Sequence, residues 1–181
     1  MRLGLLSCLA LLLAVLGGTS MRAEDKVKPD DKAKPDAKAF DDAEFVKMAA
    51  SGGMHEVMLG KVAAEKAKMD EVKKFGQMMA DDHTKANTEL MAVAKAANLA
   101  VPTKMMEKHQ KEADHFKDLK DEAFDKAYIA HMVKDHEMDV AEFTKASKEA
   151  KNPELKEFAT KTLPTLQTHL KKAKELHEKV K

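Results

Sequence analysis

Residues 72–90, VKKFGQMMADDHTKANTEL, carry apolar side chains at every third or fourth position. This stripe consists of Val72, Phe75, Met79, Ala86 and Leu90. Because an α-helix has 3.6 residues per turn, the spacing places these side chains on one face of a helix. One position within the stripe, His83, is ionisable. The stretch therefore predicts a long amphipathic helix whose buried face carries a histidine.

The same spacing recurs along the chain and predicts an all-α fold. Long helices are expected over about residues 41–68, 70–97, 122–150 and 153–180, and a shorter one from an N-cap at Thr103 to about Leu119. Pro153 suits the first turn of the last helix, whereas Pro164 is expected to kink it. The pattern describes an antiparallel four-helix bundle, with the shorter helix in the crossover between helices 2 and 4.

Composition supports this fold class and narrows the function. Gly (7), Pro (5) and aromatic residues (7 Phe, 1 Tyr, no Trp) are scarce among the 181 residues, so an all-β fold is excluded. The 32 basic residues nearly balance the 31 acidic ones and are spread over all faces, so we expect no nucleic-acid partner. The sequence has no Ser/His/Asp arrangement or glycine-rich loop, which favours a non-enzymatic function.

The first 23 residues have the pattern of a signal peptide. Arg2 precedes an apolar run, Leu3–Leu16, and cleavage is expected after Ser20 or Ala23. The run is shorter than the roughly 20 residues that a membrane span needs, so we expect an exported protein, periplasmic or secreted, without an integral span. An uncleaved N-terminal anchor is the alternative. Cleavage would remove Cys8, the single cysteine, and with it any thiol chemistry.

The mature chain is predicted to hold a linker and one domain. Residues 24–40, EDKVKPDDKAKPDAKAF, alternate charges and contain two prolines, so we expect a disordered charged linker. Residues 41–180 form the expected bundle. Its halves look alike, because residues 42–45 (DAEF) match residues 125–128 (DKAY), and His83 matches His169 when three residues are added near Pro164. A duplicated helical hairpin is therefore predicted.

Each long helix carries a side chain of a metal-ligand type on its apolar stripe. These residues are Glu56, His83, His136 and His169. Counted from the helix ends at 1.5 Å per residue, the four fall at similar heights and can meet in one layer of the bundle. Asp139 aligns with Glu56 in the internal repeat and is a further candidate. Three imidazoles and a carboxylate suit Zn, Fe or Cu better than Mg or Ca.

The layer has a second interpretation, in which the buried His and Glu only hydrogen-bond one another and fix the packing register. A metal site predicts that affinity falls as the pH drops through about 6.5, since imidazoles bind metals in their neutral form. A structural network predicts no response to metal. The sequence decides neither this question nor whether the bundle forms a homo-oligomer.

The other histidines fit the layer less well. His55 lies 100° around its helix from Glu56, and His131 lies at the edge of its stripe. Three more histidines lie among lysines and glutamates and are expected to be solvated: His109, His115 and His177.

Acidic and sulfur-containing residues near the layer have two interpretations each. Asp81, Asp82 and Asp135 are interpreted as exposed charges, with orientation of the ligand histidines as the alternative. Met79 and Met132 each precede a candidate histidine by four residues. We interpret them as core fillers, with soft ligation of Cu(I) as the alternative.

Four segments resemble an exported bacterial family called domain of unknown function 4142. They are AASGGMHEVMLGKVAAEKA (49–67), VKKFGQMMADDHTKANTEL (72–90), FDKAYIAHMVKDHEMDV (124–140) and LKEFATKTLPTLQTHLKKAKEL (155–176). The resemblance covers about residues 41–178. It implies a periplasmic or secreted bacterial protein with a ferritin-like bundle, and it brings no established activity.

Ferritin-like bundles often hold two metals through Glu and Glu-x-x-His. Here Ala80 and Val133 stand three residues before His83 and His136, so this motif is absent and a di-iron oxidase centre is not expected. We expect an exported helical-bundle protein that binds a transition metal in its core. The alternative is a non-catalytic envelope- or stress-associated bundle whose core His and Glu only specify packing.

Overall fold

The structure is a computed structural model that describes residues 39–181. This part of the chain folds into five helices and contains no strand, which confirms the all-α class. The helices are α1 (Asp42–Lys66), α2 (Asp70–Ala96), α3 (Glu107–His115), α4 (Asp121–Glu149) and α5 (Pro153–Val180). The predicted signal peptide, and all but the last two residues of the predicted linker, lie outside the described residues.

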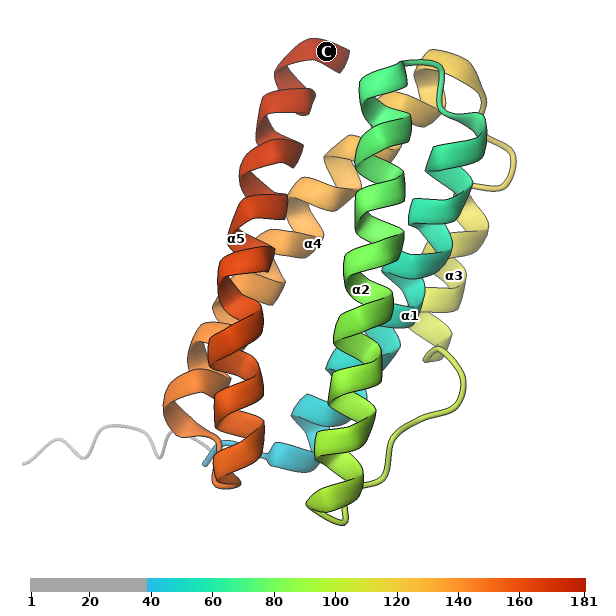
Figure 1. Ribbon diagram of the computed structural model, residues 1–181. Coiled ribbons are helices and arrows are strands. Elements are labelled where there is room, and N and C mark those ends of the chain that lie inside the picture. Colours follow the sequence, from blue (N-terminus) through green and yellow to red (C-terminus); the bar gives the residue numbers. More distant parts are fainter. Residues whose placement is uncertain (1–38) are drawn as a thin grey trace, which may run out of the picture. The chain divides into compact units, whose positions relative to one another are not determined.

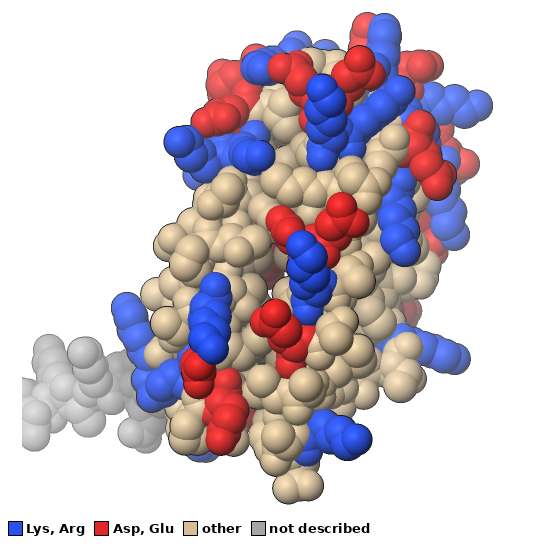
Figure 2. Space-filling view, in the orientation of Figure 1, with Lys and Arg blue, Asp and Glu red and all other residues tan. Residues whose placement is uncertain are grey.

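The four long helices form two antiparallel hairpins. Figure 1 shows α1 beside α2 and α4 beside α5, while α3 lies along the outer side of α1. The pairing of α2 with α5 and of α1 with α4 joins the hairpins into one bundle. Within residues 39–181 no helix is both long enough and apolar enough to cross a membrane. Lysines and acidic residues alternate over the face drawn in Figure 2, without a large patch of one sign.

Local sequence explains the start of two long helices. The Asp41 carboxylate accepts hydrogen bonds from the backbone N–H groups of Ala43 and Glu44, so Asp41 is the N-cap of α1. The side chain of Asn152 caps α5 in the same way, and Pro153 occupies the first turn. The α5 helix continues through Pro164.

The short helix differs from its prediction. It begins at Glu107 and ends at His115, so neither the Thr103 cap nor the end at Leu119 is correct. The reason is a tertiary contact: the backbone N–H of Met106, the N-cap residue, donates to the buried Ser51 hydroxyl of α1 at 2.7 Å. A partner on another helix thus sets where α3 begins.

The two hairpins cap each other's turns. Asp125 of α4 accepts hydrogen bonds from the backbone N–H groups of Lys68 and Met69, in the turn between α1 and α2. Asp42 of α1 accepts from the N–H groups at positions 151 and 152, in the turn between α4 and α5. Asp42 and Asp125 occupy equivalent places in the internal repeat, so these reciprocal hydrogen bonds to the turns support a duplicated hairpin.

Glycines allow α1 and α2 to pack closely. A Cβ atom added to Gly60 would lie 2.6 Å from the carbonyl oxygen of Gly76 and 2.8 Å from the backbone nitrogen of Ala80. Because these are backbone atoms, a side chain at this point would force the helices apart. Gly53 is crowded in a similar way by the side chain of Asn87.

The core has two apolar clusters along the bundle axis. The Phe143 cluster includes Phe40, Phe45, Leu90, Leu155, Phe158 and Leu166. The Phe124 cluster includes Leu59, Phe75, Met79, Tyr128, Met132 and Leu176. Phe40 packs against the ring of Phe45, with a centroid distance of 5.7 Å, and is therefore part of the Phe143 cluster. On every long helix the residue predicted for the candidate site lies between the two clusters.

Candidate metal centre

The structure brings the four predicted residues together between the apolar clusters. Glu56 projects from α1, His83 from α2, His136 from α4 and His169 from α5, and none is more than 5% exposed. They meet because each interrupts its apolar stripe at a similar height, as the spacing predicts. One ring nitrogen of each histidine lies within 4.8 Å of the others.

The closest donor atoms surround His136. Its Nε2 lies 3.3 Å from His169 Nδ1 and 3.5 Å from Glu56 Oε1. The other Glu56 oxygen, Oε2, lies 2.9 Å from His83 Nδ1. Within residues 39–181, neither Glu56 Oε1 nor His83 Nε2 has a hydrogen-bond partner, although both atoms are buried. Nitrogen and oxygen donors with unmet bonding capacity therefore converge on one point.

Outer partners determine which ring nitrogens bear the protons. His136 Nδ1 lies 3.1 Å from the carbonyl oxygen of Met132, which only accepts, so this nitrogen donates. His169 Nε2 lies 3.1 Å from a carboxylate oxygen of Asp82, so it donates as well. In these neutral tautomers His136 Nε2 and His169 Nδ1 both present lone pairs, 3.3 Å apart. Two lone pairs at this distance repel unless a cation or a proton lies between them.

Burial keeps the three imidazoles uncharged. It lowers the pKa of His83 and of His169 to about 4. It also lowers the pKa of His136 well below its usual value, and the neighbouring His83 and His169 lower it further. Neutral imidazole is the form that binds metal ions, so the histidines are ready to act as ligands near pH 7.

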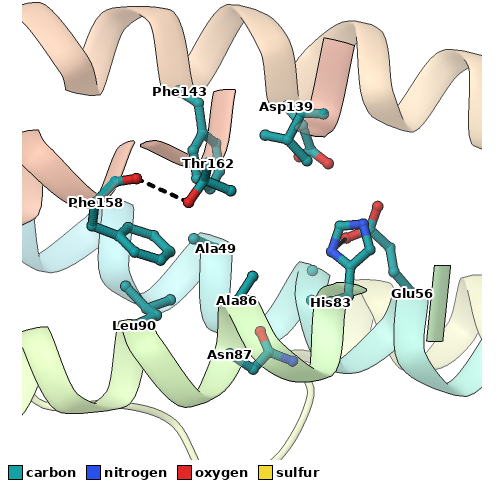
Figure 3. Close-up of a pocket in the computed structure, with 13 residues that line it drawn as sticks. Ala49, Glu56, His83, Ala86, Asn87, Leu90, Asp139, Phe143, Phe158 and Thr162 are labelled. Carbon is teal, nitrogen blue, oxygen red and sulfur yellow. Dashed lines mark hydrogen bonds and ion pairs between the residues drawn. The ribbon is translucent and has the colours of Figure 1, made fainter. Parts of the chain in front are cut away.

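Two carboxyl groups face each other in the same layer. Burial, together with the charge of Asp135, raises the pKa of Glu56 well above its usual value. Burial and the charge of Glu56 do the same to the pKa of Asp139. In Figure 3 Asp139 of α4 and Glu56 of α1 point toward each other, with His83 beside Glu56. A proton on one of the two relieves their repulsion, and a bound dication would replace that proton.

A small cavity of about 20 Å³ lies against the donor atoms, on the side of the Phe143 cluster (Figure 3). Glu56, His83 and Asp139 line its polar end, and the rings of Phe143 and Phe158 line its apolar end. The volume suits one water molecule or a monatomic ion. An organic substrate does not fit in it.

Several neighbours of the site differ from their predictions. Asp82 bonds to His169, and Asp135 has a largely buried side chain, so these two are not the exposed charges expected. Asp81 is exposed as expected. Met79 and Met132 are fully buried within the Phe124 cluster, as core fillers would be.

Sequence reasoning missed a second group of histidines. His109 is buried rather than solvated, because α3 packs against α1 and places it beside His55, which is fully buried. His177 is half-buried, whereas His115 is exposed as predicted. Burial lowers the pKa of His55 to about 3, helped by His131 and His109. The sequence did contain a pattern that indicates this second group. His55 is adjacent to Glu56, and Asp135 is adjacent to His136, so each pair combines two types of metal ligand.

Similar proteins were found among solved structures. The copper protein CopM in its Cu(II)-bound form matches with a TM-score of 0.65 at 19% identity, over 78% of this chain and 98% of that chain. Its Cu(I)-bound form gives 0.64 at 18% identity, over 77% and 97%. Its Ag-bound form gives 0.62 at 19% identity, over 76% and 96%. At such identities the likeness establishes a shared fold.

The search of curated proteins found no match. A family model described as "Domain of unknown function (DUF4142)" matches residues 27–176, which is most of the chain. This match confirms the resemblance seen in the sequence. The chain belongs to the DUF4142 family.

Proposed function

We propose that this protein is an exported, ferritin-like helical bundle that binds a copper ion in its core through Glu56, His83, His136 and His169. One observation carries the proposal: His136 Nε2 lies 3.3 Å from His169 Nδ1 and 3.5 Å from Glu56 Oε1, an oxygen with no hydrogen-bond partner among residues 39–181, and the outer partners of both rings leave lone pairs on the two nitrogens. A cation between these atoms would convert the repulsion into coordination. Asp139 is available as a further oxygen ligand.

The distances suit a first-row transition metal. Two ligands about 2.0–2.1 Å from a tetrahedral ion are separated by about 3.3 Å. The distances from His136 Nε2 to His169 Nδ1 and to Glu56 Oε1, 3.3 and 3.5 Å, are close to this value. Imidazole and carboxylate donors suit Cu, Zn and Fe, and Cu²⁺ binds most strongly in the general affinity order. The CopM structures, which contain Cu(II), Cu(I) or Ag, add support for copper over zinc and iron.

The surrounding residues favour binding over turnover. The Met132 carbonyl and Asp82 hold two imidazoles in the tautomer that ligates, and the two apolar clusters exclude bulk water from the layer. Bound copper would supply a one-electron redox couple. The cavity of about 20 Å³ leaves no space for an organic substrate, so we assign sequestration or carriage of the ion rather than catalysis.

The alternative, a layer that only specifies packing, also has an observation in its favour. Glu56 Oε2 and His83 Nδ1 lie at hydrogen-bond distance, 2.9 Å, and need no metal to do so. In this alternative a proton between His136 Nε2 and His169 Nδ1 would make their 3.3 Å contact part of the same hydrogen-bond network. The two proposals predict different responses to copper.

Metal stoichiometry tests the proposal. Wild type and His136→Gln would be dialysed against Cu²⁺ and analysed for bound metal, with His115→Gln as the matched control because His115 is exposed. We expect His136→Gln to bind one equivalent fewer than wild type, and His115→Gln to bind the wild-type amount. Equal binding by wild type and His136→Gln would contradict copper binding in this layer and favour the packing role.

Export is tested separately by intact-mass measurement of protein recovered from the periplasm or medium. We expect a mature chain that begins between Met21 and Glu24. A mass that still includes Leu3–Leu16 would favour the uncleaved anchor.

A further inference from the structure

We propose that a second transition-metal site, for Cu²⁺ or Zn²⁺, lies between α1, α3 and α4 and is formed by His55, His131 and Asp135. It uses none of the residues assigned to the first site. It therefore goes beyond the proposed function and can hold or fail independently of it.

The three side chains converge on one point. His55 Nδ1 and His131 Nε2 each lie 4.0 Å from the same oxygen, Oδ2 of Asp135. The ring centroids of the two histidines are 5.1 Å apart, and one ligand atom from each of the three residues lies within 4.8 Å of the others. Two imidazoles and a carboxylate are a donor set that zinc and copper use.

The histidine nitrogens that face this site make no hydrogen bonds in the part of the chain that the structure describes. Within residues 39–181, neither ring nitrogen of His55 has a hydrogen-bond partner, although the side chain is fully buried, and His131 Nε2 is also buried without one. Buried polar groups are normally satisfied, so a histidine with both nitrogens unpaired requires an explanation. A metal ion would bond to one nitrogen of each ring.

The observed separations fit coordination better than hydrogen bonding. A distance of 4.0 Å is too long for a hydrogen bond between nitrogen and oxygen. Ligands about 2.0–2.1 Å from a shared ion are separated by about 3.3 Å in a tetrahedron and by about 4.1 Å when they lie opposite each other. Two nitrogens cannot both lie opposite the same oxygen, so the two distances of 4.0 Å exceed the tetrahedral separation by about 0.7 Å, and a bound ion would draw the three side chains together.

The contact of α3 with α1 holds this site in place. The Ser51 hydroxyl accepts from the Met106 N–H and lies at hydrogen-bond distance, 2.6 Å, from His109 Nδ1. The ring of His109 stacks on His55 with a centroid distance of 5.5 Å and an interplanar angle of 8°. His109 is thus a positioning residue that covers one face of the His55 ring.

The same two helices supply both sites. Adjacent residues on a helix point about 100° apart, so one member of each adjacent pair faces the bundle interior and the other faces α3. His55 and Asp135 belong to the second site, while their neighbours Glu56 and His136 belong to the first. His131 and Asp135 have side chains that are 18% and 12% exposed, so the second site is closer to solvent than the fully buried His136.

Counting bound ions in three variants tests this proposal. We expect wild type to bind two equivalents of Cu²⁺, and His131→Gln and His136→Gln to bind one each. The His115→Gln control should bind two, because its exposed side chain on α3 belongs to neither site. Loss of an equivalent in His131→Gln alone would support the second site and overturn the first. Loss in His136→Gln alone would overturn the second site.

A measurement on wild type covers the case in which His131→Gln does not fold. Zn²⁺ would be titrated into ¹⁵N-labelled protein, and the imidazole nitrogens followed by long-range ¹H–¹⁵N NMR. We expect the ring nitrogens of His55 and His131 to shift together, in step with a bound equivalent. Zinc-dependent shifts confined to other histidines, or none at all, would refute the proposal.

Discussion

Replacing His169 by glutamine should make the metal-free protein less sensitive to acid. The pKa of this imidazole is lowered from 6.5 to about 4 in the folded chain, chiefly by burial. Between pH 7 and pH 5 the unfolded chain therefore takes up a proton at position 169, while the folded chain remains almost unprotonated there. Because the unfolded state binds more protons, this histidine makes stability fall as the pH falls.

The size of the effect follows from the two pKa values. With 6.5 in the unfolded and about 4 in the folded state, protonation of His169 favours unfolding by about 2 kcal/mol more at pH 5 than at pH 7. Glutamine has no titrating group and cannot contribute this term. It can still donate to Asp82, and any constant change in stability cancels when the same variant is compared at two pH values.

Urea unfolding in the presence of EDTA, at pH 7 and at pH 5, measures the difference. We expect wild type to lose about 2 kcal/mol more than His169→Gln over this interval. His115→Gln, with its exposed side chain, is expected to lose as much as wild type. If His169→Gln and wild type lost equal amounts, His169 would not be a neutral buried imidazole, and the argument for a ligand-ready site would fail.

Three further outcomes are expected. Asp125→Ala should lower the free energy of unfolding by about 1.5–3 kcal/mol in urea titrations, because it strands two backbone N–H groups, and Asp42→Ala should cost less because its contacts are more exposed. Gly60→Ala should destabilise the protein by about 1–3 kcal/mol, because the added Cβ clashes with α2. Gly52→Ala should stabilise it by about 0.5–1 kcal/mol, because the added Cβ meets nothing closer than 3.9 Å. Thermal melts should therefore show a lower melting temperature for the first variant and a higher one for the second. Asp82→Ala should weaken Cu²⁺ binding about 10-fold in competition titrations, and an unchanged affinity would mean that Asp82 does not orient His169.

The sequence was sufficient to predict the central layer because helical periodicity encodes two coordinates. The period gives the face on which a residue lies, and the count from the helix end gives its height. Glu56 and the three histidines of the first site satisfy both conditions, and the structure places them within contact distance.

The position of α3 could not be predicted in this way. The helix is short, its N-cap residue Met106 has no side-chain cap of its own, and its start depends on Ser51, more than fifty residues earlier in the chain. A single-helix pattern carries no information about such a partner. His109 and His55 were therefore assigned from their own neighbours in sequence, and their burial was missed.

The size of the histidine pKa shifts also could not be predicted from the sequence. An ordinary imidazole titrates near pH 6.5, which led to the expectation that metal affinity falls through that pH. The structure lowers the pKa of His83 and His169 to about 4, so protons compete with metal at these rings only in more acidic solution. The shift arises from packing on all sides by four helices, a property of the assembled core and not of any one segment.

The number of polar residues in the central layer supports the proposal that this layer binds a cation. A single buried polar residue is enough to fix the register of a helical bundle. Here four helices contribute Glu56, Asp139 and three histidines to one level, and they divide the apolar core into two clusters. Apolar residues of similar volume usually stabilise a core more than buried ionisable groups do. A layer this large is therefore a poor solution for packing alone, and a suitable one for holding a cation whose charge compensates the buried carboxylates.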